Sequence, residues 1–594
     1  MKKMIAMILT FSLALSGCGV LKDPPATTIG VPGPEENTPP QGGMTIQVDF
    51  ETTDEEMFTD RDQRTEYDAA DSVIIQLNGS SVTCNSASVK VEGTAVTVAG
   101  EGTYILRGTL ENGSVTVQAG ETEKVQLVLE GAQITCADSA ALNIQSGDKV
   151  FVTLAEGTEN CLSNGGSFTD SQVDGAIYST QDLTLNGTGK LTVESPAAHG
   201  IVCKDDLVVT GGTYQIHSAF HALDANDSFR AKGATLTLDA GKDGIHVEDN
   251  DDPTTGFVYI SGGSLEIEAE GDGISGGVWM QISGGTFGIL AGGGHENGES
   301  HNSGGYGDFM GGGPGGGPGG GHRPRAATTT DSDSVSMKGL KADGGILISG
   351  GTLTIDAADD AIHSNGITVI NNGSFEIFTG DDAIHAETDL QISGGTVNIP
   401  TCYEGLEAQN VRVTGGNISM VATDDGINAA GGNDASGSGG RDQMYGPPGM
   451  PSGNGSIVID GGELYIRSSG DGMDANGYVE INGGKTVVCG PNNGDTATLD
   501  YDTSGTINGG IFIGTGSSMM AQTFSDNAQG VLALQVGNQN AETTITVTDA
   551  DGKVLLTHQP ELAFSVFIYS APELKSGQTY RITVGDSAGD MQAY

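Results

Sequence analysis

Acidic residues recur in this sequence at a nearly fixed spacing. Four short phrases begin at Asp360, Asp382, Glu404 and Asp425, at steps of 22, 22 and 21 residues. Carboxylates stacked about 5 Å apart repel by roughly 3 kcal/mol per pair at an effective dielectric of about 20, so such a run needs a neutralising partner. Ca²⁺ takes six to eight oxygen ligands and fits this need. We therefore predict that Ca²⁺ is bound by Asp359, Asp360, Asp381, Asp382, Glu404, Asp424 and Asp425.

Two other interpretations of these phrases stay open. Each Asp can simply cap a turn by accepting backbone N–H groups, as Asp does at Asp-Gly and Asp-Ala corners. The doublets favour a cation over capping alone, because two carboxylates stand together in three of the four phrases. His363 and His385 also lie 22 residues apart. As zinc ligands they need further convergent donors, and a polar stack on the outer face is the alternative.

The elements that must position these residues are short strands. Apolar residues alternate with small or polar ones, as in Thr352-Leu353-Thr354-Ile355, and Gly-Gly, Asn-Gly and Asp-Gly pairs supply turns. Several strands in each unit of about 22 residues close as one coil of a solenoid. The pattern predicts an all-β fold, a right-handed parallel β-helix with rungs of about 22 residues. Inward positions are then Ile362, Ile384, Leu406 and Ile427.

The repeat also predicts the domain organisation. The β-helix should cover residues 46–504, with glycine-rich loop insertions at 291–334 and 431–455. The repeated phrase vanishes near residue 505, so residues 505–594 are expected to form a small C-terminal β domain that caps the solenoid.

The first residues resemble a lipoprotein signal. Residues 1–17 hold two lysines, a short apolar run and small residues before Cys18, which predicts cleavage there and a lipid on its thiol. An ordinary signal peptide with an incidental cysteine is the alternative. Residues 18–45 are rich in Pro, Gly and Thr and are expected to form a disordered tether. We expect the protein to be lipid-anchored on the extracellular face of a bacterial cell membrane.

Charge excludes one class of partner. The chain has 77 acidic and 25 basic residues, a formal net charge of −52, and no Lys/Arg cluster of the kind that binds nucleic acid. Six further cysteines are scattered without zinc spacing, which favours core positions, although disulfides stay possible outside the cell. They are Cys84, Cys136, Cys161, Cys203, Cys402 and Cys489.

The chain resembles a bacterial extracellular carbohydrate-binding family whose β-helix is related to pectate lyases. The resemblance rests on DDAIH at 359–363 and 381–385, DDGIN at 424–428, GDGMD at 470–474 and FTDRDQRTEYD at 58–68. It covers roughly residues 55–590. It implies a calcium-bearing β-helix that binds plant cell-wall polysaccharide such as cellulose or acidic pectin, and does not by itself imply catalysis.

Three functions follow as hypotheses. The first is surface binding of a polyuronate or cellulose, with contacts at His363, His385, Tyr403, Glu407 and Arg412. Cellulose has less support, since Trp279 is the single tryptophan. The second is a Ca²⁺-dependent pectate-type lyase, which needs a base near the bound uronate. Its candidate bases, each expected to be a solvated surface cation instead, are Lys338, Lys341, Arg412 and Arg467. The third is an adhesin-like spacer.

Overall fold

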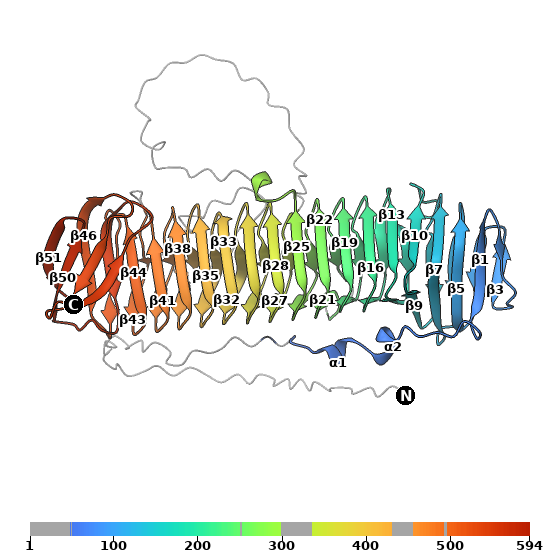
Figure 1. Cartoon of the computed structure of the whole chain (residues 1–594), viewed down its shortest axis with the longest axis horizontal. Helices are drawn as coiled ribbons and strands as arrows, with labels where there is room; N and C mark the ends of the chain where they lie inside the picture. Colours follow the sequence, from blue (N-terminus) through green and yellow to red (C-terminus); the bar gives the residue numbers. More distant parts are fainter. Residues whose placement is uncertain are drawn as a thin grey trace, which may run out of the picture. The chain divides into compact units, whose positions relative to one another are not determined.

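The fold is almost entirely β. The computed structural model describes residues 48, 50–249, 252, 254–298, 336–429, 455–491 and 496–594. A single long sheet, dominated by parallel pairs, runs from β1 (Val73–Gly79) to β49 (Phe564–Ser570), as expected for a β-helix (Figure 1). The predicted signal peptide (1–17), Cys18, the predicted tether (18–45) and most of both predicted glycine-rich loops lie outside the described residues.

Each coil contributes strands to three parallel rows, because the alternating pattern allows one face of every strand to point inward. The register joins residues 22 apart where the repeat is regular, as in Ile362↔Ile384 and Ile384↔Leu406. The first row contains β14 (His199–Cys203), β17 (Leu223–Ala225), β20 (Ile245–Val247), β23 (Ile274–Gly276), β26 (Leu340–Ala342), β29 (Ile362–Ser364), β32 (Ile384–Ile392), β34 (Leu406–Val413), β36 (Ile427–Ala429), β39 (Met473–Ala475) and β42 (Asp500–Tyr501).

The second and third rows follow the same rule. The second contains β12 (Asp182–Gly187), β15 (Asp206–Val209), β18 (Ser228–Ala231), β21 (Phe257–Ile260), β24 (Trp279–Ile282), β27 (Gly345–Ile348), β30 (Ile367–Ile370), β37 (Ser456–Ile459), β40 (Tyr478–Ile481) and β43 (Ser504–Ile507); β32 and β34 run through both of the first two rows. The third contains β13 (Lys190–Ser195), β16 (Thr213–Ser218), β19 (Thr235–Ala240), β22 (Ser264–Ala269), β25 (Thr286–Ala291), β28 (Thr352–Ala357), β31 (Ser374–Thr379), β33 (Thr396–Cys402), β35 (Asn417–Ala422), β38 (Glu463–Ser468), β41 (Lys485–Cys489) and β44 (Ile511–Gly516).

The two ends of the solenoid are less regular. At the start lie β1 (Val73–Gly79), β2 (Val82–Thr83), β3 (Val89–Glu92), β4 (Ala95–Val98), β5 (Gly102–Leu110), β6 (Ser114–Gln118), β7 (Lys124–Cys136), β8 (Leu142–Ser146), β9 (Lys149–Leu154), β10 (Glu159–Asn164) and β11 (Gly175–Ser179). At the end lie β45 (Asp526–Asn527), β46 (Val531–Gln539), β47 (Ile545–Thr548), β48 (Val554–His558), β49 (Phe564–Ser570), β50 (Thr579–Val584) and β51 (Ser587–Gln592).

Parallel pairing continues past residue 504, where the sequence placed the end of the solenoid. β43 pairs with β40, β44 with β41, and β45 with β43, all in parallel. Antiparallel pairing begins where β49 joins β44, and β47, β48, β50 and β51 form a separate four-stranded sheet. The boundary differs because the acidic phrase ends earlier than the inward apolar residues, such as Ile507 and Phe512, which are fully buried.

One continuous apolar core fills the coils. Ile362, Ile384, Leu406 and Ile427 are fully buried and belong to the same cluster. The Gly-Gly turns are required by backbone geometry, because the second glycine adopts a positive φ, for example 104° at Gly351. All six described cysteines are free, and four of them are buried.

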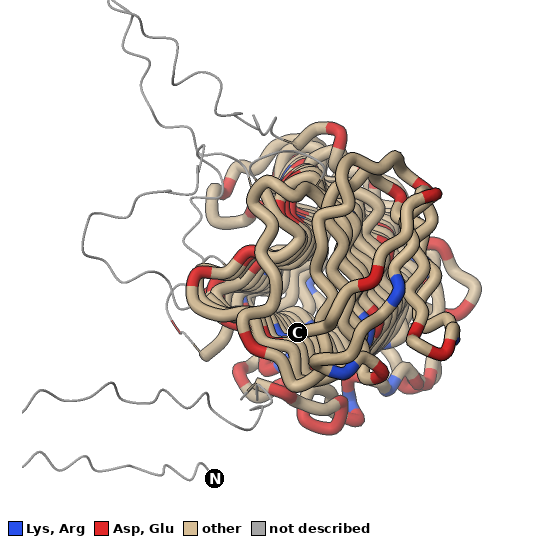
Figure 2. Tube along the Cα trace, turned by 90° about the vertical axis from the view of Figure 1, so that its left-hand side faces the viewer, with Lys and Arg blue, Asp and Glu red and all other residues tan. Residues whose placement is uncertain are grey.

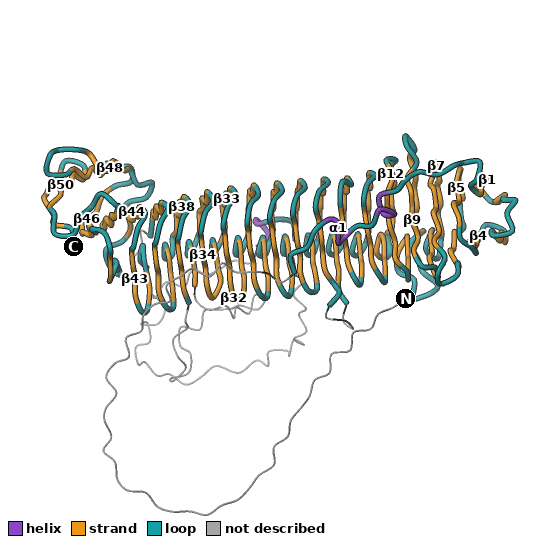
Figure 3. Tube along the Cα trace, turned by 90° about the horizontal axis from the view of Figure 1, so that it is seen from below, coloured by secondary structure: helices purple, strands orange, loops and turns teal. Residues whose placement is uncertain are grey.

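The segment before β1 lies against the second row (Figure 3). It contains α1 (Asp54–Met57) and α2 (Asp60–Gln63). Phe50 stacks on Trp279 with ring centroids 5.5 Å apart, while buried Asp62 accepts from Thr184 (2.7 Å) and pairs with Lys149 (2.9 Å). Among the described residues, no helix has the length and apolar character needed to cross a membrane.

Candidate functional site

The recurring polar residues form two neighbouring columns along the first row of strands. Acidic residues also surround the solenoid on other sides (Figure 2). Column 1 precedes each inward apolar residue by two positions and contains His199, His221, Asp243, Asp272, Lys338, Asp360, Asp382, Glu404, Asp425 and Asp471. Column 2 follows that apolar residue directly and contains Asp224, His246, Ser275, Lys341, His363, His385, Glu407, Asn428, Asp474 and Asp500.

Carboxylates of column 1 cap the next coil. One oxygen of Asp360 accepts the backbone N–H of Asp382 (3.1 Å), and one oxygen of Asp382 accepts that of Glu404 (3.3 Å). Asp425 accepts the backbone N–H of Asp471 in the same way. Capping therefore occurs, but it uses only one oxygen of each carboxylate. A backbone N–H does not neutralise the negative charge of the carboxylate.

In the middle of the columns the charge of Asp360 is neutralised by the protein itself. We call Lys338, Asp360, His363, Asp382 and His385 the lysine–histidine stretch. The Lys338 ammonium lies 2.8 Å from Asp360, His363 lies 2.7 Å from the same carboxylate, and all five residues are buried. Burial alone would raise the pKa of Asp360, but Lys338 and His363 together hold it well below its usual range.

His385 occupies the boundary of this stretch. Its Nδ1 lies 3.3 Å from Asp382 and 2.9 Å from Glu407, and its ring stands 4.7 Å from that of His363. Burial opposes the charged imidazolium, yet the two carboxylates raise the pKa of His385 well above its usual value. A single cation is therefore shared between two buried acids.

The coils that follow place further acids in both columns. We call Glu404, Asp424, Asp425, Asp471 and Asp474 the carboxylate stretch. Within the described part of the chain, no Lys, Arg or His lies within ion-pair distance of Glu404, Asp425 or Asp471. Burial and neighbouring carboxylates raise the pKa of Glu404 and Asp425 well above the ordinary range. Burial and the acids around it, Asp474 foremost, raise that of Asp471 to about 7.

Two details of the carboxylate stretch fit an oxygen-liganded cation. One oxygen each from Asp424 and Asp425 lies 2.3 Å from the place a Cβ would take on Gly470, so only glycine fits beneath them. The buried Asn428 donates to Glu404 (2.8 Å), while its own carbonyl oxygen has no hydrogen-bond partner among the described residues. Carboxylate and amide oxygens are the ligands that Ca²⁺ prefers.

The structure separates the predicted metal ligands into these two environments. Asp360 and Asp382 have internal cations, whereas Glu404, Asp424 and Asp425 lie in the carboxylate stretch; Asp359 and Asp381 flank column 1 and are half-buried. Asp359 also pairs with Lys338 (2.9 Å). The prediction from sequence omitted Asp471, Asp474 and Asn428, although the phrase GDGMD at 470–474 marked two of them.

The predicted carbohydrate contacts do not form one surface. His363, His385 and Glu407 are buried within column 2, so as placed they present little area to a polymer. Tyr403 is half-buried beside column 1, and Arg412 lies in the second row, where it pairs with Asp460. Spacing alone indicated that these residues stack, but it could not distinguish a covered stack from an open one.

The candidate bases for a lyase are engaged elsewhere. Lys338 is buried, which corrects the expectation of a solvated cation, because Asp359 and Asp360 hold it between them. Burial lowers its pKa, but these two carboxylates outweigh burial and raise it, the opposite of what a base requires. Arg412 pairs with Asp460, Arg467 lies 3.8 Å from Glu561, and Lys341 lies 3.8 Å from Asp272.

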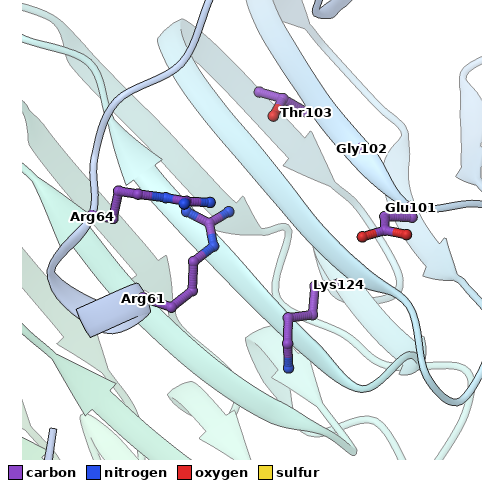
Figure 4. A pocket seen from close by; sticks show the side chains of 6 residues that line it. All are labelled: Arg61, Arg64, Glu101, Gly102, Thr103 and Lys124. Carbon is purple, nitrogen blue, oxygen red and sulfur yellow. The ribbon is translucent and has the colours of Figure 1, made fainter. Parts of the chain in front are cut away.

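A basic pocket lies at the other end of the chain. It is lined by Arg61 and Arg64 at α2, by Gly102 and Thr103 of β5 with the adjoining Glu101, and by Lys124 of β7. Figure 4 shows the two guanidinium groups beside one another over the sheet. Arg61 also stacks on Phe151, 4.4 Å from the ring centroid. Three cations thus gather in a chain of net charge −52, and one of them, Lys124, is paired with Asp148.

Comparison with known proteins identifies a family. A family model described as carbohydrate-binding domain-containing protein matches residues 92–383 and 365–443. A carbohydrate-binding domain-containing protein of Acetivibrio thermocellus is 32% identical over 195 residues, which cover 32% of this chain and 68% of the relative. A solved structure, the gadolinium derivative of a polysaccharide lyase-like protein from C. thermocellum, is 31% identical, with a TM-score of 0.37 over 37% of this chain and 92% of that one.

Proposed function

The chain belongs to the carbohydrate-binding domain-containing protein family, and from this premise we propose that it binds acidic plant cell-wall polysaccharide outside the cell, with Ca²⁺ held by the carboxylate stretch. The observation that carries the Ca²⁺ proposal is the absence of internal cations around Glu404, Asp425 and Asp471 among the described residues. Buried carboxylates without a cation are unstable as a group, and a bound divalent ion removes this repulsion.

The residues that would hold Ca²⁺ are Asp424, Asp425, Asp471 and Asp474, with the Asn428 carbonyl oxygen beside them. When bound, the ion supplies positive charge where an acidic protein meets an acidic polymer. Asp424 and Asp425 present oxygens over Gly470, and the column-1 caps hold their backbone in register.

An acidic polymer is favoured over cellulose by the aromatic residues. Trp279, the single tryptophan, is stacked between Phe50 (5.5 Å) and Phe257 (4.3 Å), so its faces are already used. The basic pocket at Arg61, Arg64 and Lys124 supports the same choice, because guanidinium groups bind carboxylates with two parallel hydrogen bonds.

Binding without cleavage is the form of the proposal, since the candidate bases pair with carboxylates. A Ca²⁺-dependent lyase is the alternative, and an adhesin-like spacer is a second one. Purified protein incubated with polygalacturonate and Ca²⁺ distinguishes the three functions. We expect retention of the polymer, loss of retention in EDTA and no absorbance of unsaturated product; product formation would establish the lyase, and failure to retain any polymer would leave the spacer.

The site is tested by matched pairs of variants. Asp424→Asn/Asp425→Asn should lose Ca²⁺-dependent retention, while Asp549→Asn/Asp551→Asn should retain it. This control pair, one half-buried and one exposed residue, lies in a turn of the C-terminal sheet. Arg61→Gln/Arg64→Gln should weaken polygalacturonate binding roughly tenfold, and Arg581→Gln, an exposed arginine of β50, should not. Equal binding by all four proteins would refute both sites.

Display on the cell surface through Cys18 is part of the proposal. Two or more acyl chains hold a protein firmly on a membrane, so a lipidated Cys18 would keep the solenoid at the cell surface. Cys18→Ala should release the protein into the medium. Unchanged partition of this variant into membranes would reject the lipid anchor.

A further inference from the structure

Three histidines and two aspartates converge on consecutive coils near the start of the columns, in the teal to green part of Figure 1. We call His199, His221, Asp224, Asp243 and His246 the histidine cluster. The rings of His199 and His221 stand 5.0 Å apart and those of His221 and His246 4.3 Å apart, nearly parallel. Their backbone is fixed by the first row, in which β14, β17 and β20 pair in parallel.

Donor atoms in this cluster lie at the spacing of ligands on one ion. Ligand atoms of His221, Asp243 and His246 all lie within 4.8 Å of one another. His221 Nδ1 is 3.2 Å from Asp243 Oδ2, and two ligands on a tetrahedral Zn²⁺ stand about 3.3 Å apart. The backbone N–H of Asp243 points at the same nitrogen (3.1 Å), so an ion here replaces that contact.

His246 is oriented as a ligand by a carboxylate. Its Nδ1 lies 2.9 Å from Asp224, whose other oxygen pairs with Lys204 (3.2 Å), and its Nε2 faces Glu248 at 3.4 Å. A carboxylate that accepts from one ring nitrogen leaves the other for the metal, an arrangement that recurs in zinc sites. Asp224 is therefore a positioning residue, and Glu248 lies beside the other ring nitrogen of His246.

His199 completes the cluster beside His221. Its Nδ1 is buried and has no hydrogen-bond partner among the described residues. A ligand atom of His199 also lies within 4.8 Å of those of His221 and Asp224.

The cluster differs from the histidines of the lysine–histidine stretch in access and charge. The side chains of His221, Asp243 and His246 are 11%, 15% and 23% exposed, so an ion can reach them. His363 and His385 are 5% and 0% exposed, and Lys338 already supplies a positive charge beside Asp360. Imidazole nitrogen combined with carboxylate oxygen selects Zn²⁺ and related ions over Ca²⁺, which prefers oxygen alone.

We propose that the histidine cluster binds one divalent transition-metal ion of the Zn²⁺ class through His221, Asp243 and His246. Because His221 belongs to both sets of donors, the cluster holds one ion and not two. The site goes beyond the proposed polysaccharide binding and uses none of its residues.

Metal titration of the mature, metal-free protein tests the proposal. Zn²⁺ should bind with one equivalent by calorimetry, Co²⁺ should give visible absorption of a four-coordinate site, and millimolar Ca²⁺ should not displace either ion. His221→Ala should weaken Zn²⁺ binding at least 100-fold. The matched control is His217→Ala, which removes an exposed histidine that stands 3.1 Å from Asp239 on neighbouring strands.

A second variant separates ligand loss from misfolding. Asp243→Asn keeps an oxygen to accept the backbone N–H of Asp272, so its melting temperature in EDTA should match the wild type while Zn²⁺ binding falls at least tenfold. His363→Gln should bind Zn²⁺ as the wild type does. Retained binding in His221→Ala, loss of binding in His217→Ala or His363→Gln, or no stoichiometric binding by the wild type would each overturn the site.

Discussion

The lysine–histidine stretch and the carboxylate stretch occupy the same columns of the same solenoid, yet they solve the problem of stacked acids differently. Around Asp360, a buried Lys338 supplies positive charge, and His363 lies against the same carboxylate. Around Asp425, the described residues offer further carboxylates and backbone N–H groups. The difference teaches that one repeating backbone arrangement can hold stacked acids in two electrostatic environments, one with an internal cation and the other with further carboxylates among the described residues.

The largest effect is expected at Lys338. Lys338→Met leaves Asp360, which is fully buried, without its ammonium and should cost about 3–5 kcal/mol of the free energy of unfolding. Chemical denaturation measures it. Lys341→Met is the control, since that side chain is 29% exposed and 3.8 Å from its partner, and should cost less than about 1 kcal/mol. Equal costs would mean that Lys338 is not the internal cation.

Removing one carboxylate should change the free energy of unfolding in opposite directions in the two stretches. Asp360→Asn removes the carboxylate that pairs with Lys338 and His363, and should lower the free energy of unfolding by about 3 kcal/mol. Asp425→Asn in EDTA keeps the cap on Asp471 and relieves repulsion, so it should be neutral or stabilising by about 1 kcal/mol.

Added Ca²⁺ should then reverse the order at Asp425. At about 100-fold excess over the dissociation constant, the wild type gains about 2.7 kcal/mol and Asp425→Asn gains much less. The same denaturation curves, repeated with Ca²⁺, provide the measurement. Identical gains in both proteins would mean that Asp425 does not bind Ca²⁺.

The smallest effect is expected in the dependence on pH. The folded-state pKa of Asp471 is raised to about 7, so its contribution to stability is complete at acid pH and is lost as pH rises through about 7. The pKa of His385 is also raised, and its contribution, present below about pH 6.5, is lost as pH rises through its folded value.

Ca²⁺ separates these two titrations, because it favours ionised Asp471 and does not touch His385. Between pH 6 and 8, the opening free energy measured by hydrogen exchange at β39 should fall by about 1 kcal/mol in EDTA. With Ca²⁺ it should stay constant. The opening free energy at β32 should fall with rising pH in both conditions. A pH response at β39 that ignores Ca²⁺ would contradict the assignment of the ion to the carboxylate stretch.

Much of the architecture follows from periodicity. A strand alternates with a period of two, and a shift of one residue would turn Ile384 from the core to the outside, so the 22-residue step already pairs Ile362 with Ile384. The same step places Asp360 over Asp382 and His363 over His385. The end of the solenoid was less predictable, because β43 and β44 keep the inward apolar residues without the acidic phrase.

The sequence by itself therefore determined which residues share a column, since register in a solenoid is fixed by spacing and by the apolar face. Only the tertiary structure decided what each acid meets. Lys338 looked like a surface cation, because its burial depends on how neighbouring coils close over it; His221, Asp243 and His246 showed no metal-binding spacing along the chain. Charge and solvent access are properties of the packed coils, and packing is the information that a one-dimensional repeat does not carry.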